Sequence, residues 1–420
     1  MRQPNSAMRV DAARRAWDGA LQATGDGLTV QCELITPMYG GGVTPGKVDS
    51  ALPVRPTALR GQLRFWWRLL QRTGGEKELF QHDARALFSA ETALWGGISS
   101  NGPQASKVAV RVRQVDPAEL VTWKGKLSKF PAYALMLESD EDPHLLKGGY
   151  TFQLTLDFSS SMQSGQRDQV IEALRWWASF GGVGARTRRG LGAVRMSDGG
   201  EVRTPVSAEE PVSAEEVEKH GGWLAVGQPV KDPIAAWYKA VEALRVFRQD
   251  RNEGRNTGQG KHPGRSRWPE ADTIRRHTNM ASPNHQPEHE VDGVYPRAAF
   301  GLPIVFHFKD RGRGDPSDHS LVPVSSENEK RDRMASPLIL RPWHNGQRWC
   351  PAALLLPGWR ERVSVRAGLV RQEKLVSKGS PAWPEDLDER KQMAARIAPM
   401  KKRGEDALTA FMNFFKAGAD

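Results

Sequence analysis

The sequence predicts an α+β fold of two tandem ferredoxin-like domains, with a glycine-rich loop and an additional, mostly helical C-terminal region. Its length, its order of strand-like and helix-like segments, and one glycine-rich turn predict this fold. The 420 residues allow two to four domains at roughly 100–200 residues each, and two is the economical number. With 39% hydrophobic residues and 41 glycines, the chain has the composition of a globular protein that buries sizeable cores.

The first domain, 27–196, follows an N-terminal extension at 1–26 and has the ferredoxin-like element order. Alternation of apolar residues predicts its strands, and apolar residues at helical spacing predict its helices. In chain order the elements are a strand at 27–36, a helix at 58–71, strands at 107–114 and 150–158, a helix at 167–179 and a strand at 190–196.

An acidic stretch at 197–221 separates the two halves. It contains the tandem copies PVSAEE at 205–210 and 211–216, and proline, serine and glutamate in tandem make a poor core. We expect a solvated linker; a surface helix starting at Ser213 is the alternative. Either structure marks a domain boundary.

The second domain, 222–360, is expected to be a degenerate copy of the first. Its predicted elements are a helix at 234–248 and strands at 302–308, 336–341 and 351–356. The stretch 250–292 is rich in Gly, Asn, Arg and His, which predicts a long basic loop. The tail, 361–420, is expected to be mostly helical over 385–416, with a break at Pro399.

Charge and composition exclude several classes of protein. There are 60 Lys and Arg against 49 Asp and Glu, a net charge of +11, which suggests a polyanionic partner, most simply nucleic acid. Cys32 and Cys350 are the two cysteines, too few for a disulfide framework or a four-cysteine zinc site. No stretch has the length and apolarity of a membrane span or a signal peptide, so we expect a cytoplasmic protein with no membrane partner.

The glycine-rich turn Gly181–Gly192 is the sharpest motif. Five glycines in its twelve residues (GGVGARTRRGLG) let the backbone adopt positive φ and approach another backbone closely. It also carries Arg186, Arg188 and Arg189, whose guanidinium groups suit bidentate phosphate contacts. The patterns of dinucleotide and nucleoside-triphosphate sites are absent. A clamp on RNA backbone therefore fits best; a hairpin turn that is merely basic is the alternative.

Two further basic features lie upstream. Gly41–Lys47 has the spacing of a P-loop, but Val48 stands where a magnesium-binding Ser or Thr belongs. A turn carrying Lys47 towards a phosphate is therefore favoured; an ordinary loop is the alternative. The predicted helix at 58–71 places Arg60, Arg64 and Arg68 on one stripe, with no Glu four residues on to neutralise them. We expect this stripe to face phosphate; a solvated helix face is the alternative.

In the second half, RSRWPEADTIRR at 265–276 combines arginines with Trp268. That side chain is expected either to stack on a base or to cap a core. His285–His289 (HQPEH) matches an inverted zinc-protease motif, but Pro283 and Pro287 make the required helix very unfavourable, so a solvated loop is predicted.

These segments together resemble a known family. TPMYGGG (36–42), RPTALRGQLRFWWR (55–68) and FGGVGARTRRG (180–190) resemble the RAMP superfamily of CRISPR RNA-binding proteins, and more narrowly the first subunits of type III-B (Cmr) complexes. GRSRWPE (264–270), AAFGLPI (298–304) and RMASPLIL (333–340) extend the resemblance over about 27–360.

The resemblance implies a non-catalytic subunit with two RRM-like domains that holds the 3′ region of the CRISPR RNA and its paired single-stranded target RNA. Other Cmr subunits would be its partners and would cut the target, and no catalytic residue, cofactor or metal is expected. The candidate RNA-binding residues are Gly41, Lys47, Arg55, Arg60, Gln62, Arg64, Arg68, Gly182, Gly184, Arg186, Arg188, Arg189, Arg265, Arg267, Trp268 and Arg333.

Two alternatives stay open. The superfamily also contains metal-independent endoribonucleases that process CRISPR transcripts, which need a histidine or tyrosine beside the RNA; His82 or Tyr39 would be the first candidate. A scaffold that only assembles the complex would use exposed apolar patches instead, and could lose its arginines without losing RNA.

Overall fold

The computed structural model describes residues 27–74, 80, 83–99, 102–123, 130–135, 143–198, 210–258, 264–288 and 290–418. The predicted extension at 1–26 and part of the predicted linker, 199–209, lie outside the described residues. The chain divides into two units. The first takes its described residues from Met1–Ser128, Asp140–Thr187 and Leu191–Val212, and the second from Lys129–Ser139, Arg188–Gly190 and Ser213–Asp420.

The first unit is built on a four-stranded antiparallel sheet with the strand order β5-β8-β1-β9. Apolar residues alternate along β1, so that Leu28, Val30 and Cys32 are buried on one face. The elements of this unit are β1 (Gly27–Leu34), β2 (Met38–Tyr39), α2 (Pro56–Thr73), α4 (Ala84–Trp95), β3 (Gly97–Ser99), β4 (Gly102–Gln104), β5 (Val108–Gln114), β6 (Leu120–Thr122), β7 (His144–Leu146), β8 (Thr151–Phe158), α5 (Ser164–Phe180) and β9 (Val194–Asp198).

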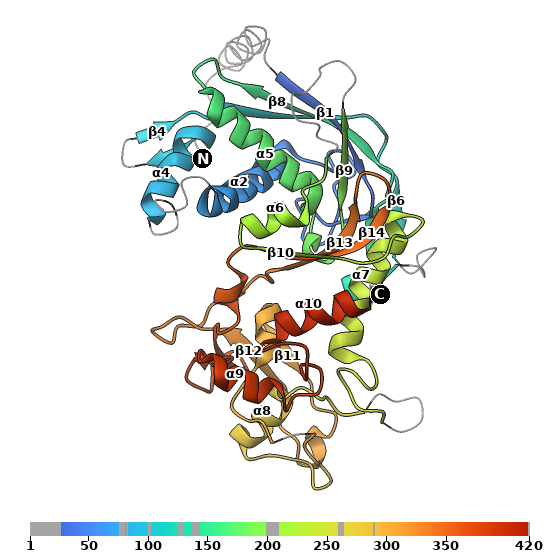
Figure 1. The fold of residues 1–420 in the computed structure, drawn as a ribbon, viewed down its shortest axis with the longest axis vertical. Coiled ribbons are helices and arrows are strands. Elements are labelled where there is room, and N and C mark those ends of the chain that lie inside the picture. The colour runs from blue at the N-terminus through green and yellow to red at the C-terminus, as the bar shows by residue number, and fades with distance from the viewer. Residues whose placement is uncertain are drawn as a thin grey trace. The chain divides into compact units, whose positions relative to one another are not determined.

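Helices α2 and α5 lie side by side (Figure 1). Helix α2 begins at Pro56, whose missing N–H and fixed φ suit the first helical position. The two helices bury large aromatic side chains against each other: the Trp66 ring lies 6.0 Å from that of Trp176 and 6.2 Å from that of Phe180. Every strand and helix expected for the first domain is present within a few residues, whereas α4 was not predicted.

The second unit contains two antiparallel sheets, ordered β10-β14-β13 and β11-β12-β15-β16, with β17 paired to β15. Its strands are β10 (Trp223–Val226), β11 (Ile304–Phe306), β12 (His319–Pro323), β13 (Leu338–His344), β14 (Trp349–Leu355), β15 (Arg366–Arg371), β16 (Lys374–Leu375) and β17 (Ser380–Pro381). Its helices are η1 (Ala132–Ala134), α6 (Ala214–Lys219), α7 (Pro233–Gln249), α8 (Glu270–Thr278), η3 (Pro296–Phe300), η4 (Arg311–Arg313), η5 (Trp359–Arg362), α9 (Leu387–Ala394) and α10 (Ala407–Ala417).

Local signals account for several of these elements. Asp232 caps α7 by accepting from the Ala235 backbone N–H at 2.7 Å, and Pro233 occupies the first helical position. Ser213 caps α6 in a capping box with Glu216, which confirms the alternative of a helix starting there.

Two expectations for the second half are wrong. The stretch 250–292 is not one long loop, because α8 forms within it and buries Ile274 in a core. The tail after 361 is not mostly helical at its start, because β15, β16 and β17 join a sheet with β12. The helix α8 and the three strands are short, and tertiary burial stabilises them where local propensity is weak.

Overall, the chain is a mixed α and β protein with antiparallel sheets. None of the helices in the described part of the chain has the length and apolarity needed to span a bilayer.

Candidate nucleic-acid interface

Two glycine-bearing segments of the first unit pair along their backbones. The Ile35 N–H donates to the Ala193 carbonyl at 2.9 Å, and the Gly192 N–H donates to the Pro37 carbonyl at 2.8 Å. Further along, the Ala185 N–H donates to the Tyr39 carbonyl at 2.7 Å. We call residues 36–47 with 181–187 and 191–193 the paired-loop surface. It joins the end of β1 to the loop that follows α5.

The glycines of this surface stand where two backbones come too close for a side chain. A Cβ at Gly192 would lie 1.9 Å from the Val183 carbonyl oxygen, and φ there is +62°. At Gly184, where φ is +80°, a Cβ would lie 2.6 Å from the Tyr39 carbonyl oxygen. The predicted positive φ and close backbone approach are therefore confirmed.

The backbone approached by these glycines is the protein's own. A Cβ at Gly182 would lie 2.6 Å from the Gly192 carbonyl oxygen, and one at Gly41 would lie 3.3 Å from Gly184 Cα. The close approach that the sequence suggested for RNA is thus taken by the partner loop within this unit. RNA contact at Gly41, Gly182 and Gly184 stays a prediction.

Two cations extend from the paired-loop surface into solvent. Lys47 is exposed at a turn closed by the Gly42 N–H donating to the Lys47 carbonyl at 2.9 Å. Arg186 is exposed and holds a left-handed backbone conformation with φ of 59°. Among the residues that the structure describes, neither forms an ion pair. Both side chains are therefore available to an external anion.

Arg55 supports this surface from within. It precedes α2, and its guanidinium donates to the Gly41 carbonyl at 2.5 Å and the Gly42 carbonyl at 3.4 Å. Charge-assisted bonds of this kind fix a backbone that has few side chains of its own. The geometry makes Arg55 a positioning residue for the turn that carries Lys47.

The arginine stripe on α2 has an acidic partner on another helix, and RNA contact at Arg60, Arg64 and Arg68 stays a prediction. Glu91 on α4 is only 6% exposed and receives Arg64 Nε at 2.7 Å and an Arg68 guanidinium nitrogen at 2.5 Å. Arg60 donates to the Trp95 carbonyl, and burial together with the nearby Arg64 lowers the pKa of Arg60. The compensating acid comes from a second helix, which the spacing rule for one helix does not consider.

Gln62 lies on the same helix, half-buried. The role predicted for it in RNA binding stays a prediction.

Arg188 and Arg189 belong to the second unit although they lie in the glycine-rich turn. The Trp237 indole N–H donates to the Arg189 carbonyl at 2.6 Å. A Cβ at Gly190, where φ is +79°, would lie 2.5 Å from the same ring. Both arginine side chains are half-buried, and desolvation, with Arg362 adding to it, lowers the pKa of Arg188.

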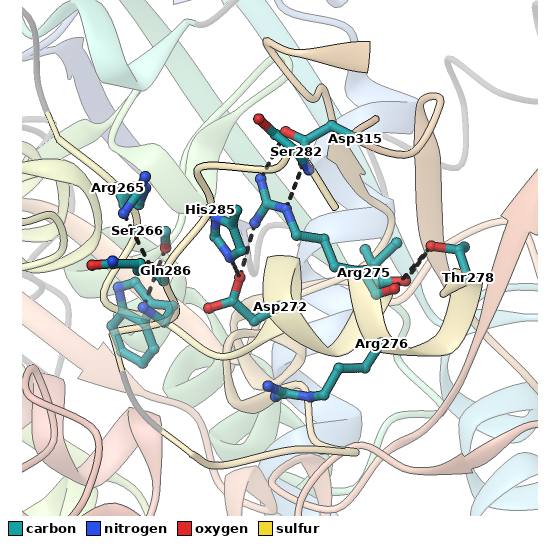
Figure 2. Close-up of polar contacts among 12 residues, drawn as sticks. Arg265, Ser266, Asp272, Arg275, Arg276, Thr278, Ser282, His285, Gln286 and Asp315 are labelled. Carbon is teal, nitrogen blue, oxygen red and sulfur yellow. Dashed lines mark hydrogen bonds and ion pairs between the residues drawn. The ribbon is translucent and has the colours of Figure 1, made fainter. Parts of the chain in front are cut away.

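Two of the three remaining arginine candidates in the second unit donate to backbone carbonyls. Arg265 donates to the Asn284 carbonyl at 2.6 Å, and Figure 2 shows it beside Gln286. Arg267 donates to the Asn252 carbonyl at 2.5 Å, and Arg333 is exposed.

Trp268 does not face solvent, which contradicts the idea that it stacks on a base. It is 0% exposed, and its ring packs 5.3 Å from that of Phe247. Packing of this large apolar side chain places it in the core, the other role that the sequence allowed.

The sequence also suggested candidates for a catalytic or metal-binding role, namely His82, Tyr39, His285 and His289. His82 lies outside the described residues, and Tyr39 is half-buried on the paired-loop surface. His285 lies in a loop, as predicted, and its Nε2 is 2.6 Å from Asp272 Oδ1 (Figure 2), while His289 lies outside the described residues. Within the described ranges, no group of three or more His, Cys, Asp or Glu side chains is arranged to hold a metal ion.

Comparison with protein families finds a match for part of the chain. Residues 31–195 match the model of the RAMP superfamily, which confirms for this part of the chain the resemblance drawn from its motifs. That segment contains the paired-loop surface and helix α2. No curated protein matches the sequence.

Similar solved structures include Cmr1 from Pyrococcus furiosus in its apo form, at 17% identity, with 78% of this chain and 87% of that chain covered and a TM-score of 0.43. A chain of a type III-B Cmr-beta complex bound to cognate target RNA and AMPPnP matches at 9% identity over 94% and 99%, with a TM-score of 0.43. A chain of a type IV-B CRISPR complex matches at 18% identity over 43% and 93%, with a TM-score of 0.30.

Proposed function

We propose that the chain is a non-catalytic, RNA-binding RAMP subunit of a type III-B CRISPR (Cmr) effector. It holds the 3′ region of the CRISPR RNA and the target RNA paired to it, while neighbouring subunits cut the target. Its partners in this proposal are the two RNAs and the other Cmr subunits, and the cytoplasm is its location.

One observation carries the proposal. The paired-loop surface lies inside the segment that matches the RAMP superfamily, and it exposes Lys47 and Arg186 on two loops that hydrogen-bond to each other along their backbones. Because these loops are already formed, less conformational entropy is lost when their exposed cations bind a phosphate chain. It reads charge and shape, so that sequence recognition is left to base pairing between guide and target.

The proposal divides the candidate cations into two groups. Lys47 and Arg186 contact phosphates. Arg55, Arg60, Arg64 and Arg68 instead have structural roles. Arg55 bonds to the Gly41 carbonyl of the paired-loop surface, and the other three bond to Glu91 or the Trp95 carbonyl on α4.

We also propose that both units are ferredoxin-like. In the first unit, one helix follows the first strand of the main sheet and another follows the third, and the strand order is β5-β8-β1-β9. In the second, β10, α7, β13 and β14 repeat the beginning of that order, and their sheet order, β10-β14-β13, matches β1-β8-β5. Helix α10 then contacts α7, as a second helix of such a unit does.

The test is a gel shift combined with a cleavage assay on the full chain. The probe is a labelled single-stranded RNA of roughly 40 nucleotides without metal, measured over a salt series. The expected result is binding that weakens as salt rises, with the RNA intact. Cleavage that survives a chelator and disappears in Tyr39→Phe or His82→Ala supports the endoribonuclease instead. Absence of binding at any salt contradicts the proposal.

A further inference from the structure

The loop between β11 and β12 has a basic tip that the sequence motifs did not single out. The two strands pair in antiparallel register, with Phe306 opposite His319, so residues 307–318 form the connection. We call Lys309–Gly314 the basic tip. Lys309, Arg311 and Arg313 are exposed on it. Gly312 lies between the two arginines, and Gly314 follows the second.

The base of this loop is fastened to the second unit by a buried charge network. Arg275 on α8 binds Asp315 through two bonds of 2.9 and 3.0 Å, and the Ser282 N–H donates to the same carboxylate at 3.1 Å (Figure 2). The Arg275 guanidinium also lies 5.0 Å over the ring of Phe308, which is buried in the core. The bonds to Arg275 lower the pKa of Asp315, so this carboxylate stays charged at neutral pH.

The path of the tip is set by its own backbone. The Asp310 carbonyl accepts from the Arg313 N–H at 2.8 Å and from the Asp315 N–H at 3.2 Å. Gly314 has φ of +108°, and a Cβ there would lie 2.8 Å from the Ala281 carbonyl oxygen. These contacts define the path of the loop backbone, and the side chains of Lys309, Arg311 and Arg313 are exposed.

The three cations of the tip form few ion pairs with the described residues of the protein. Arg311 lies 3.6 Å from Asp318, with both side chains exposed at 68% and 38%, and an exposed pair of this kind contributes little to stability. Among the described residues, Lys309 and Arg313 form no ion pair. Asp310 is the single acid of the tip, and it is half-buried.

We propose that the basic tip is a second contact for the phosphate backbone of single-stranded RNA. This inference rests on the proposed function and adds a surface to it, in the other unit of the chain. Guanidinium groups bind phosphate bidentately, and the glycine between the two arginines leaves room for a backbone to approach. Because the loop is already ordered, binding loses little conformational entropy.

The composition of the tip favours RNA over an acidic protein segment. Its six residues, KDRGRG, include no apolar side chain. Protein interfaces depend on apolar and aromatic anchors at their centres, whereas a phosphate chain is bound through charge.

The test measures RNA binding by the full chain over a salt series, with the triple variant Lys309→Ala/Arg311→Ala/Arg313→Ala. Three lost phosphate contacts at roughly 0.7 each should reduce the magnitude of the negative slope of log K against log salt by about 2. The matched control removes the same charge from exposed lysines on α7, α9 and the turn before α10: Lys239→Ala/Lys391→Ala/Lys401→Ala. Its slope should equal that of the wild type, and both variants should keep the wild-type melting temperature.

A second measurement locates the contact directly. RNA carrying 4-thiouridine is cross-linked to the wild-type chain, and the attached peptides are identified by mass spectrometry. We expect a cross-linked peptide from 307–318 besides one from the paired-loop surface.

The outcomes separate this inference from the proposed function. If the wild type binds RNA but the tip variant keeps its slope and 307–318 does not cross-link, the inference is overturned and the proposed function stands. If the tip variant binds RNA normally but loses retention on immobilised polyglutamate, the tip is an acidic-protein surface and the RNA assignment is wrong. If the wild type binds no RNA, both fail together.

Discussion

Helix α2 and the paired-loop surface both supply candidate RNA-binding cations in the first unit, yet the structure uses them differently. On α2, Arg64 and Arg68 share the buried carboxylate of Glu91, and Arg60 bonds to the Trp95 carbonyl. On the paired-loop surface, Lys47 and Arg186 are exposed without an ion pair among the described residues.

The difference shows that an arginine stripe in a sequence does not reveal where its charge is used. The α2 guanidinium groups hold α4 in place, and their net charge is reduced by Glu91. The loop cations have no acid beside them within the paired-loop surface, because its residues include no Asp or Glu. Density of arginine predicts a positive surface, but the acidic residues that fold against it decide which cations remain available.

The largest expected effect comes from Gly192→Ala. A Cβ there would lie 1.9 Å from the Val183 carbonyl oxygen at φ of +62°, so the substitution combines backbone strain with a clash against the partner loop. We expect a loss of several kcal/mol in the free energy of unfolding, measured by chemical denaturation.

The matched control is Gly149→Ala. Gly149 has φ of +92°, and no described heavy atom lies within 4 Å of the Cβ that would be added, so only the strain remains, about 1–2 kcal/mol. Equal losses in the two variants would show that the close pairing of the loops contributes nothing.

A smaller effect is expected for Glu91→Gln. It removes the charge that Arg64 and Arg68 share, but those arginines are 29% and 38% exposed, so we expect a loss of about 1–2 kcal/mol in stability rather than that of a fully buried pair. The slope of log K against log salt for RNA should stay unchanged, measured by gel shift. A steeper slope would mean that the released arginines contact phosphate. That result would contradict the claim that the α2 arginines and the loop cations have different roles.

Arg55→Ala tests the boundary between positioning and contact. It deletes the bonds to the Gly41 and Gly42 carbonyls, so we expect about 1 kcal/mol lower stability and severalfold weaker RNA binding with an unchanged salt slope. Arg113→Ala, at an exposed position on β5, is the control and should change neither. If the slope instead becomes less steep by roughly 0.7 and the free energy of unfolding is unchanged, Arg55 is a phosphate contact.

The sequence predicted the four strands of the main sheet and helices α2 and α5 in the first domain because each has a strong local pattern, such as the apolar alternation of β1 and the apolar stripe of α2. It did not predict α8 or the strands β15–β17, which are short and depend on burial against partners distant in the chain. Local propensity cannot reveal such elements, because their stability comes from tertiary contacts.

For the candidate site, the motif Gly181–Gly192 predicted positive φ and a close backbone approach but not what its glycines approach. That required knowing that 36–42 pairs with it. Trp268 illustrates the same limit: a tryptophan between arginines fits both a stacking platform and a core, and only its packing on Phe247 decides. The basic tip at 309–314 was missed because three cations beside three nearby aspartates look neutral, until Asp315 is found buried against Arg275.

The most direct test compares two double variants that remove equal charge. Lys47→Ala/Arg186→Ala should reduce the magnitude of the negative slope of log K against log salt for single-stranded RNA by about 1.4, at roughly 0.7 per phosphate contact. Arg72→Ala/Arg85→Ala, which removes exposed cations from the end of α2 and the start of α4, should leave the slope at the wild-type value. If instead the paired-loop variant keeps the wild-type slope, the paired-loop surface does not hold the RNA.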